Sequence, residues 1–354
     1  MHMKKENRID VKINILDLLK NIVNKEEQYT IPIFIPHRGC PNECVFCNQR
    51  KISGMQKNVT VKEVDNIISK YLDYFDGNKK IQIAFFGGSF TGIDINSQIE
   101  YLKIANKYIK SGKVDSIRIS TRPDYISPTI LKVLKKYNVR NIELGIQSMD
   151  NEVLRLSKRG HDNISVIRAS LLIRYYGFKL GHQMMIGLPG SNEIKEIETI
   201  KSLLKLKPDE LRIYPVYVIN PSELYDMYVL GKYVPLTLEE AISRTYVVLR
   251  ECKRSNVRII RIGLQSTDEI TSNNLGLVGP VCDNFAEYVM AKVVCNVIEE
   301  NIKNKLKEDM INEIIIHVPL RYASIVVGPK KVNKEYLINK YKKYNLKIKL
   351  KGEE

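Results

Sequence analysis

The chain has 354 residues, of which 44% are hydrophobic and 27% are charged, as in an ordinary globular protein. It has no apolar run of about 20 residues, the length that crosses a bilayer, and no apolar segment of a signal peptide near its N-terminus. We therefore expect a cytoplasmic protein and exclude membrane-spanning, secreted and disordered proteins. The 56 Lys and Arg residues against 40 Asp and Glu give a net charge of +16, which suits a polyanion such as RNA. These basic residues are scattered, so no segment stands out as a binding arm.

Strand and helix patterns alternate along most of the chain. After a predicted helix at residues 11–24, apolar strands are predicted at residues 31–36, 81–86, 116–120, 141–145, 179–186 and 210–214. Helical spacing of apolar residues predicts helices at residues 61–75, 99–109, 128–137, 163–176 and 194–206. This alternation predicts an α/β fold with a parallel sheet covered by helices. Six strand–helix units rather than eight predict a partial (β/α)6 TIM-like barrel, open on one side.

The pattern changes after about residue 265. A predicted helix at residues 288–306 is followed by short strands at 314–319 and 323–327 and a Lys-rich helix at 336–344. We interpret this part as a small α+β appendage. The predicted organisation is an N-terminal helical extension (1–29), a barrel core (30–265) and a small C-terminal domain (266–354).

Three of the six cysteines, Cys40, Cys44 and Cys47, follow the first predicted strand within eight residues. In parallel α/β folds, loops after strands form the active site. The spacing C-x3-C-x2-C allows three thiolates to hold one centre, either zinc or an iron–sulfur cluster. A closed zinc site needs a fourth ligand, for which His37 is a candidate. Three cysteines alone would leave one iron of a four-iron cluster open to another ligand.

The cysteine segment, with Phe46 before its last cysteine, resembles the signature of radical S-adenosylmethionine (SAM) enzymes. The resemblance implies that Cys40, Cys44 and Cys47 hold a [4Fe–4S] cluster whose fourth iron binds SAM. It implies reductive cleavage of SAM to methionine and a 5′-deoxyadenosyl radical, which takes a hydrogen atom from the substrate. An electron donor such as flavodoxin or ferredoxin is implied as well.

Polar and glycine residues after the next strands are the expected contacts to SAM. Glycines after the second strand would let the backbone approach the ligand closely, where this family has a Gly-Gly motif. A glutamine after the fourth strand would bond the ribose or methionine part, and a cation would pair with the SAM carboxylate. Besides Phe46, the expected contacts are Gly87, Gly88, Ser89, Thr121, Arg122, Gln147, Lys158, Arg159 and Gln183.

Several short sequence motifs between residues 31 and 265 resemble those in the radical SAM domain of the Elongator catalytic subunit and its short bacterial relatives. Examples are Gly87-Gly-Ser-Phe-Thr91, Leu144-Gly-Ile-Gln-Ser148 and Lys158-Arg-Gly-His161. This resemblance implies tRNA modification, with tRNA as the substrate. Only 89 residues follow Gln265, without an acetyl-CoA-binding glycine loop, and Ser120 stands where those relatives have an acidic residue. We therefore do not expect complete Elongator chemistry.

Two alternatives stay open. The first is a radical SAM enzyme that acts on a small molecule such as a tetrapyrrole. Oxygen-independent coproporphyrinogen oxidases share the cysteine spacing, but their Tyr-x-His element is missing because residue 35 is Ile. The second is a metal-stabilised RNA-binding protein without turnover, which would need the cysteines but not the SAM-side motifs.

Overall fold

The computed structural model describes residues 8–12, 28–35, 38–40, 44–48, 59–75, 78–253, 255–264, 276–306 and 311–351. The chain forms two compact units, residues 24–283 and residues 1–23 together with 284–354. This division differs from the predicted one, because the N-terminal segment belongs with the C-terminal residues. None of the described helices is both long and apolar enough to cross a bilayer.

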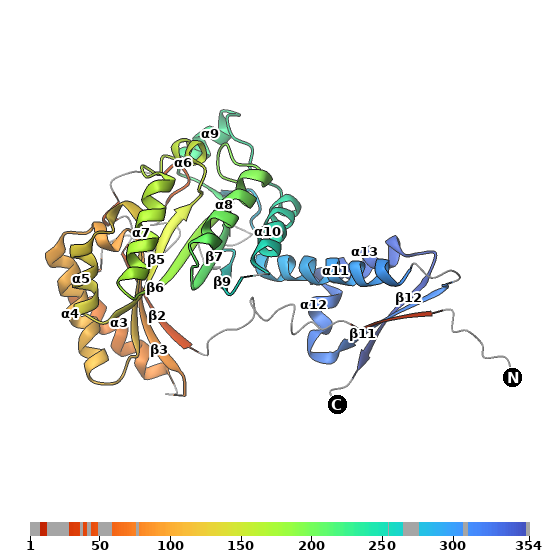
Figure 1. The fold of residues 1–354 in the computed structure, drawn as a ribbon, viewed down its shortest axis with the longest axis horizontal. Helices are drawn as coiled ribbons and strands as arrows, with labels where there is room; N and C mark the ends of the chain where they lie inside the picture. The colour runs from red at the N-terminus through yellow and green to blue at the C-terminus, as the bar shows by residue number, and fades with distance from the viewer. Residues whose placement is uncertain are drawn as a thin grey trace. The chain divides into compact units, whose positions relative to one another are not determined.

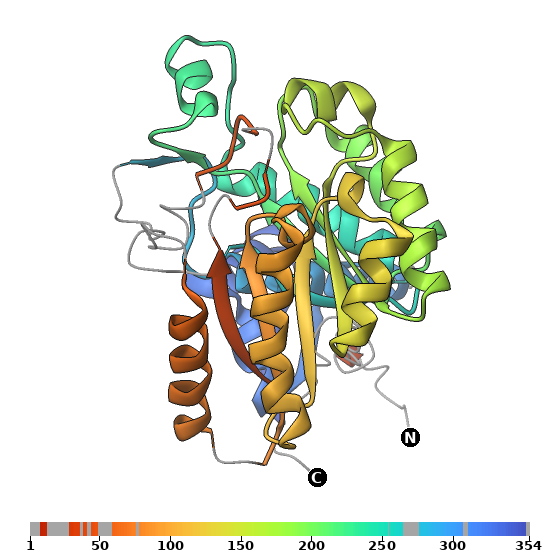
Figure 2. The ribbon, with the colours of Figure 1, turned by 90° about the vertical axis from the view of Figure 1, so that its left-hand side faces the viewer.

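The larger unit is built on a seven-stranded sheet in which all neighbouring strands are parallel (Figure 1). Helices pack along one face of this sheet (Figure 2). The strands of this sheet follow one another in chain order, as expected for a partial barrel. Of the described strands, only the two-residue β8 (Val218–Ile219), which pairs with β10 (Leu277–Val278) instead, comes between β7 and β9. The strands, in their order in the sheet, are β2 (Gln28–Ile35), β3 (Lys80–Gly87), β4 (Ser116–Thr121), β5 (Val139–Gln147), β6 (Lys179–Ile186), β7 (Glu210–Pro215) and β9 (Arg258–Ile262).

Six helices connect these strands, and each begins after a Thr, Ser, Asp or Asn side chain that accepts a backbone N–H of the first turn. These caps give a partner to a backbone N–H of the first turn, which has none within the helix. Two shorter helices, α6 (Asn151–Leu156) and α9 (Glu223–Val229), lie in the loops after β5 and β7. The six connecting helices are α3 (Val61–Tyr74), α4 (Ile95–Lys110), α5 (Pro128–Lys136), α7 (Asn163–Tyr175), α8 (Glu193–Lys205) and α10 (Leu238–Cys252).

The predicted partial barrel is confirmed, with one correction. A seventh strand, β9, follows α10 and pairs with β7, although the sequence analysis ended the sheet at the sixth strand. Its five residues include three charged or half-exposed positions, and only Ile259 and Ile262 are buried. This short edge strand therefore lacks the continuous apolar run that marks central parallel strands.

The smaller unit contains a three-stranded parallel sheet in the order β1 (Arg8–Lys12), β11 (Glu313–Pro319) and β12 (Asn345–Lys351). Its helices are α11 (Phe285–Lys305), α12 (Ala323–Val327) and α13 (Val332–Lys340). The predicted helix from residue 11 is wrong for Val11 and Lys12, which belong to β1; residues 13–24 lie outside the described residues.

The predicted strand at residues 323–327 is also wrong, because this segment is helix α12. Its β-branched residues favour a strand locally. However, β11 and β12 are parallel neighbours, and parallel strands need a crossover connection, which is usually helical. The Lys-rich helix expected at residues 336–344 is α13, which begins and ends four residues earlier.

Candidate active site

The cysteine loop begins at the carboxyl end of β2 and is bonded to the glycine loop after β3. The backbone N–H groups of Arg38 and Gly88 both donate to the Ile35 carbonyl, at 3.3 and 2.9 Å. The N–H of Ser89 donates to the Arg38 carbonyl at 2.8 Å. The two loops therefore form one structural element that presents Cys40 at the sheet edge where active sites of parallel folds lie.

Glycines at the contact between these loops are required by close packing. A Cβ on Gly39, whose φ is +72°, would lie 2.2 Å from the Ser89 carbonyl oxygen. A Cβ on Gly88 would lie 2.1 Å from the Arg38 carbonyl oxygen. The sequence analysis expected Gly87 and Gly88 to make room for a ligand. The structure adds another reason for Gly88, which is contact between loops, and leaves the ligand role a prediction.

The second half of the cysteine loop is attached to the loops after β5 and β7. The N–H of Val45 donates to the Ser157 carbonyl at 3.3 Å, and the Val45 carbonyl accepts the N–H of Leu224 at 2.7 Å. The Asn48 side chain donates to the Pro221 carbonyl at 2.8 Å. Segments more than 100 residues apart in the sequence thus position Cys44 and Cys47.

Phe46, which the resemblance placed beside SAM, packs against a buried apolar cluster under these loops. The cluster includes Val45, Leu188, Val216 and Leu224. An aromatic at this position therefore anchors the loop between its last two cysteines. Contact with SAM stays a prediction for Phe46.

Two buried arginines lie at the cysteines. Arg159 donates from Nη1 to the Cys44 Sγ at 3.1 Å and from Nη2 to the Gly145 carbonyl. Arg122 is held by two hydrogen bonds to Asp124, at 3.0 and 2.9 Å. Burial, and then the charge of Cys44, raise the pKa of Cys40, while both arginines oppose this rise. The two arginines therefore favour the thiolate form of Cys40, but burial has the larger effect and its pKa stays above the ordinary value.

The arginine side chains also retain unused donors. Nη1 of Arg122 and Nε of Arg159 are buried and have no hydrogen-bond partner among the described residues. Buried donors normally have a partner, so unpaired ones at a loop of cysteines suggest a missing anion. Within the described part of the chain, no three His, Cys, Asp or Glu side chains are gathered closely enough to hold a single metal ion. His37, the candidate fourth zinc ligand, lies outside the described residues.

Ser89 and Thr121 form a buried hydroxyl cluster with Thr91 between the ends of β3 and β4. The Ser89 and Thr121 oxygens are 2.8 Å apart, and those of Thr91 and Thr121 are 2.6 Å apart. The N–H of Arg122 donates to the Ser89 hydroxyl at 3.2 Å. These side chains therefore align the loop that carries Arg122, a role the sequence analysis did not assign.

Gln147 and Gln183 lie together at the ends of β5 and β6, where the Gln183 amide donates to the Gln147 side-chain oxygen at 3.2 Å. Gln147 has a φ of +74°, which is rare for a residue with a side chain and is concentrated at functional sites. A Cβ on Gly145 would lie 3.1 Å from Nε2 of Gln147 and 3.5 Å from Nη2 of Arg159. Gly145 therefore lets the predicted glutamine and the predicted arginine approach each other.

Lys158 is the predicted residue that the structure separates from this group. Its side chain is 57% exposed and forms a salt bridge of 2.6 Å with Glu223 on α9. Of the two adjacent cations proposed for the SAM carboxylate, only Arg159 contacts a cysteine. Sequence alone could not distinguish them, because adjacent residues point in different directions and only the packing decides which is buried.

The sequence analysis missed a buried layer of charged side chains within the sheet. Arg118 on β4 and Arg212 on β7 both donate to Glu143 on β5, at 3.1 and 2.7 Å. Arg118 and Arg258 also pair with Glu210. Burial opposes ionisation of Glu210, but its two arginine partners outweigh burial and lower its pKa. Charged residues inside predicted central strands, which are usually apolar, were the available signal.

Arg212 lies at the edge of this layer, with its guanidinium carbon 5.2 Å from the centre of the Phe86 ring. It also donates to the Tyr214 hydroxyl at 3.2 Å, and Ser120 donates to Glu143 at 3.4 Å. Polar and aromatic groups on β3, β4, β5 and β7 thus line the sheet.

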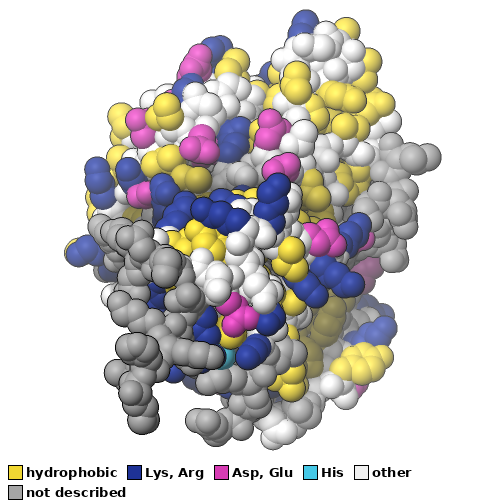
Figure 3. Space-filling view, turned by 90° about the vertical axis from the view of Figure 1, so that its right-hand side faces the viewer, with side chains coloured by type: hydrophobic (Ala, Val, Ile, Leu, Met, Phe, Trp, Pro, Cys, Tyr) yellow, Lys and Arg dark blue, Asp and Glu magenta, His cyan; other side chains and the backbone are white. Residues whose placement is uncertain are grey.

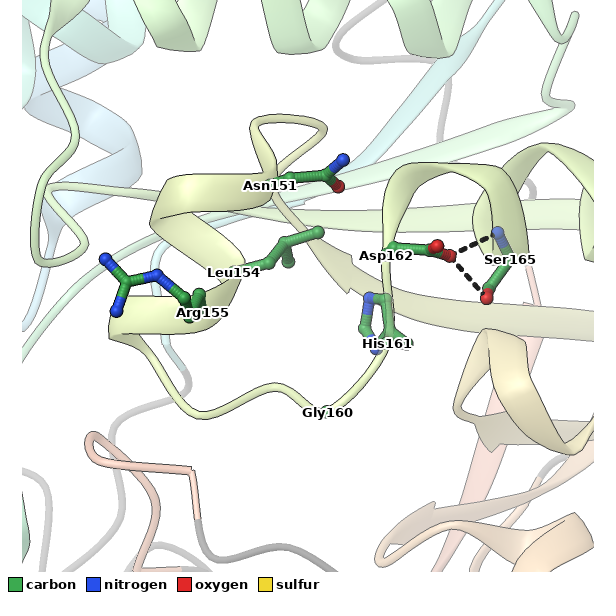
Figure 4. Close-up of a pocket in the computed structure, with 7 residues that line it drawn as sticks. All are labelled: Asn151, Leu154, Arg155, Gly160, His161, Asp162 and Ser165. Carbon is green, nitrogen blue, oxygen red and sulfur yellow. Dashed lines mark hydrogen bonds between the residues drawn. The ribbon is translucent and has the colours of Figure 1, made fainter.

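A cavity of about 420 Å³ lies between α6 and the start of α7 (Figure 4). His161 lines it, is only 8% exposed, and has no hydrogen-bond partner for either ring nitrogen among the described residues. Burial, then Arg159 and Arg122, lower the pKa of His161 to about 3, so its ring is neutral at pH 7. Asp162 turns away to cap α7 through Ser165. A neutral His161 avoids repulsion with the two arginines at the cysteines.

Comparison with known families agrees with this geometry. The family model described as the Radical SAM superfamily matches residues 34–204, which run from β2 to α8 and include all three cysteines. This chain belongs to the radical SAM superfamily of enzymes. A second model, the Radical_SAM C-terminal domain, matches residues 208–294.

Relatives within the superfamily include enzymes named for tRNA modification. The tRNA uridine(34) acetyltransferase of Methanocaldococcus jannaschii is 32% identical over 183 residues, which are 46% of this chain and 34% of that enzyme. An uncharacterized protein of the same organism is 30% identical over 237 residues, 62% of this chain and 70% of that protein. This chain therefore spans about a third of the acetyltransferase.

A solved structure has the same fold. Archaeal Elp3 of Methanocaldococcus infernus, lacking its N-terminal residues 1–46, superposes with a TM-score of 0.59 and 24% identity. The match covers 82% of this chain and 65% of the Elp3 chain. This structural likeness supports the barrel fold of the radical SAM region.

Proposed function

We propose that this protein binds a [4Fe–4S] cluster through Cys40, Cys44 and Cys47, binds SAM at the cluster, and takes a hydrogen atom from a nucleoside of tRNA. The observation that carries the proposal is the buried contact of Arg159 with Cys44 in a C-x3-C-x2-C loop at the carboxyl end of a parallel sheet. A loop that served only as a scaffold would not need buried cations with unused donors beside its cysteines.

The residues present fit a cluster and SAM. Cysteine sulfur is the ligand that iron–sulfur clusters use, and the charges of Arg122 and Arg159 favour the thiolate form. The unpaired donors of these arginines suit an anionic cluster or a carboxylate. When bound, the cluster and SAM would supply one-electron reductive cleavage of SAM, and with it an acceptor for a substrate hydrogen atom.

The chain's own residues would orient and enclose these groups. Asp124 would hold Arg122 in place through its two hydrogen bonds, and Gly145 would give Arg159 and Gln147 room to face one ligand. The apolar packing of Phe46 would keep the loop closed against water. The electron would come from a donor such as a flavodoxin or ferredoxin, which we propose as a partner.

Two observations support tRNA as the substrate. Relatives with a similar radical SAM region include enzymes named for tRNA modification, and the net charge of +16 favours a polyanion. Acetyl transfer is not part of the proposal, because the match covers only about a third of the acetyltransferases.

The test compares Cys44→Ala with Cys252→Ala, which removes a buried thiol on α10 instead. Both variants and the wild type would be reconstituted anaerobically, reduced with dithionite and given SAM, with and without bulk tRNA. We expect cluster assembly and 5′-deoxyadenosine formation in the wild type and in Cys252→Ala but not in Cys44→Ala, with tRNA stimulating formation.

Each failure has a separate meaning. Formation of 5′-deoxyadenosine by Cys44→Ala would overturn the cluster assignment. Formation that is indifferent to tRNA would overturn the tRNA proposal and favour a small molecule such as a tetrapyrrole. An intact cluster that never cleaves SAM would favour a metal-stabilised RNA-binding protein without turnover.

A further inference from the structure

Positive charge is concentrated at the C-terminal end of the chain, contrary to the even distribution expected above. Residues 320–351 contain ten Lys and Arg residues and a single acidic one, Glu335. This segment of 32 residues therefore carries +9 of the total charge of +16. In the structure it forms α12, α13 and β12 of the smaller unit. Lys and Arg side chains are also prominent beside hydrophobic ones on the face drawn in Figure 3.

The part of this segment that projects its charge is a four-residue loop, Gly328-Pro-Lys-Lys331, between α12 and α13. Lys330 and Lys331 are both exposed and have positive φ values of +50° and +63°. Gly328 has a φ of +78°, and a Cβ there would lie 2.9 Å from a methyl carbon of Val332. The loop thus has one defined conformation that turns two adjacent lysines to solvent.

A buried asparagine holds this loop in place. Asn333, in the first turn of α13, is 5% exposed and donates to the carbonyls of Ala291 on α11 and Ile325 on α12, at 2.8 and 3.3 Å. These bonds attach the start of α13 to both neighbouring helices. The lysines next to Asn333 are therefore presented by a rigid support, which lowers the entropy lost on binding a ligand.

Lys330 and Lys331 of the loop, and Lys334 at the start of α13, have no acidic partner among the residues that the structure describes. Lys330, Lys331 and Lys334 form no salt bridge within the described part of the chain, whereas Lys340 and Lys347 pair with Glu299 and Glu313. Exposed lysines that are already paired contribute little to binding a polyanion. Three unpaired ones within five residues give a local field suited to phosphates.

Apolar and aromatic side chains lie next to these charges. Val332 and Tyr336 are four residues apart on α13, so they share one face, and each is 45% exposed. The Lys340 ammonium lies 5.0 Å from the centre of the Tyr336 ring. An exposed tyrosine beside unpaired lysines can stack on a nucleobase while the lysines contact the backbone.

We propose that the loop surface, defined as Lys330, Lys331, Val332, Lys334 and Tyr336, binds single-stranded RNA. KH modules bind single-stranded RNA with a four-residue Gly-x-x-Gly loop between two helices, which clamps the backbone. The present loop has the same length and the same place between helices, with Lys331 in place of the second glycine. The flanking elements form a strand–helix–helix–strand unit in which β11 and β12 are paired.

This inference deepens the proposed function and rests on its RNA substrate, but it does not depend on SAM cleavage. It assigns the recognition of unpaired nucleotides to the smaller unit and leaves the chemistry to the cysteine loop. Exposed tyrosine favours RNA over a lipid surface here, because a base can stack on its ring. An acidic protein would not need an aromatic face beside the lysines.

The test uses the full-length protein and a fluorescent, unstructured oligouridylate, with binding measured by anisotropy over a range of salt concentrations. The variant Lys330→Ala/Lys331→Ala/Lys334→Ala is compared with Lys103→Ala/Lys110→Ala/Lys113→Ala, which removes the same charge from exposed lysines of the larger unit. We expect the first triple variant to bind at least about tenfold more weakly. The slope of its log affinity against log salt concentration should be smaller in magnitude by about 2, because each of the three lost phosphate contacts contributes roughly 0.7. The second should resemble the wild type.

Substitutions of Tyr336 test the inference independently, because they leave the net charge of the protein unchanged. Tyr336→Ala should weaken binding about tenfold by removing a stacking surface, whereas Tyr336→Phe should retain wild-type affinity. Equal affinities of all variants for RNA would overturn the inference. The inference would also be overturned if variants of the loop surface lost binding to phosphatidylserine vesicles or to an acidic flavodoxin but still bound RNA.

An assay of SAM cleavage distinguishes a failure of this inference from a failure of the proposed function. The loop variants should form 5′-deoxyadenosine without RNA at the wild-type rate and should lose only its stimulation by RNA. If wild-type protein bound RNA through the loop surface but never cleaved SAM, the inference would stand and the proposed function would fail.

Discussion

The two units use charged side chains in opposite ways. In the barrel, Arg118 on β4, Glu143 on β5 and Glu210 on β7 lie buried, and each is paired. In the smaller unit, Lys330 and Lys331 are exposed and no acidic group described in the structure pairs with them. A buried charge without a partner costs several kcal/mol, whereas exposed charges contribute little to stability. Paired charges thus maintain the barrel, and unpaired ones are available for a ligand.

The largest effect expected from this difference is at Glu143. Glu143→Ala would leave Arg212 without its carboxylate partner inside the sheet. We expect a loss of about 3–5 kcal/mol in the free energy of unfolding, measured by chemical denaturation. Glu335→Ala, on the exposed surface of α13, should stay within about 0.5 kcal/mol. Similar values for the two variants would contradict the contrast between the units.

A second prediction concerns the contact between the cysteine and glycine loops. In Gly88→Ala the new Cβ meets the Arg38 carbonyl, and relieving that clash must displace one of the loops. We expect a loss of about 3 kcal/mol together with a lower iron content after reconstitution. Gly181→Ala on β6 is the matched control, because neither glycine has a left-handed φ and the carbon added at Gly181 would meet no atom closer than 3.4 Å. A normal iron content in Gly88→Ala would show that the loops are not coupled.

The adjacent pair Lys158 and Arg159 tests which cation serves the cysteines. Arg159→Ala removes the donor to Cys44, and we expect SAM affinity to fall about 10–100-fold, as for other groups that support metal ligands. Lys158→Ala removes only an exposed pair with Glu223 and should bind SAM like the wild type. Equilibrium binding of SAM to reconstituted protein distinguishes the two. Equal losses of SAM affinity in the two variants would mean that Lys158 also serves the SAM site.

The smallest effect is a pH dependence from Glu210. Its folded-state pKa lies below the ordinary value of 4.5, so its stabilising contribution is present above pH 4.5 and is lost as pH falls through the folded-state pKa. The difference in unfolding free energy between the wild type and Glu210→Gln should therefore shrink as the pH is lowered from 7 into this acid range. A difference that stays constant with pH would mean that the carboxylate is not stabilised by Arg118 and Arg258.

Much of the barrel could be predicted from the sequence. The alternation of apolar strands and capped helices is a local signal, because burial on both faces of a parallel strand leaves a continuous apolar run. The seventh strand, β9, lacked that run, and α12 looked like a strand because its β-branched residues have that preference. In both cases contacts with residues distant in the sequence determine whether the segment forms a strand or a helix.

By itself the sequence determined the chemistry that is available: three closely spaced cysteines, the glycine loop after the second strand, and the glutamines and arginines that follow later strands. These signals depend on residue type and short spacing. Only the tertiary structure decided that Arg159 rather than Lys158 contacts Cys44, that Gly39 and Gly88 are needed where two loops touch, and that residues 8–12 complete the sheet of the C-terminal unit. Such choices depend on which side chains are buried together, and burial is a property of the packed chain and not of its local pattern.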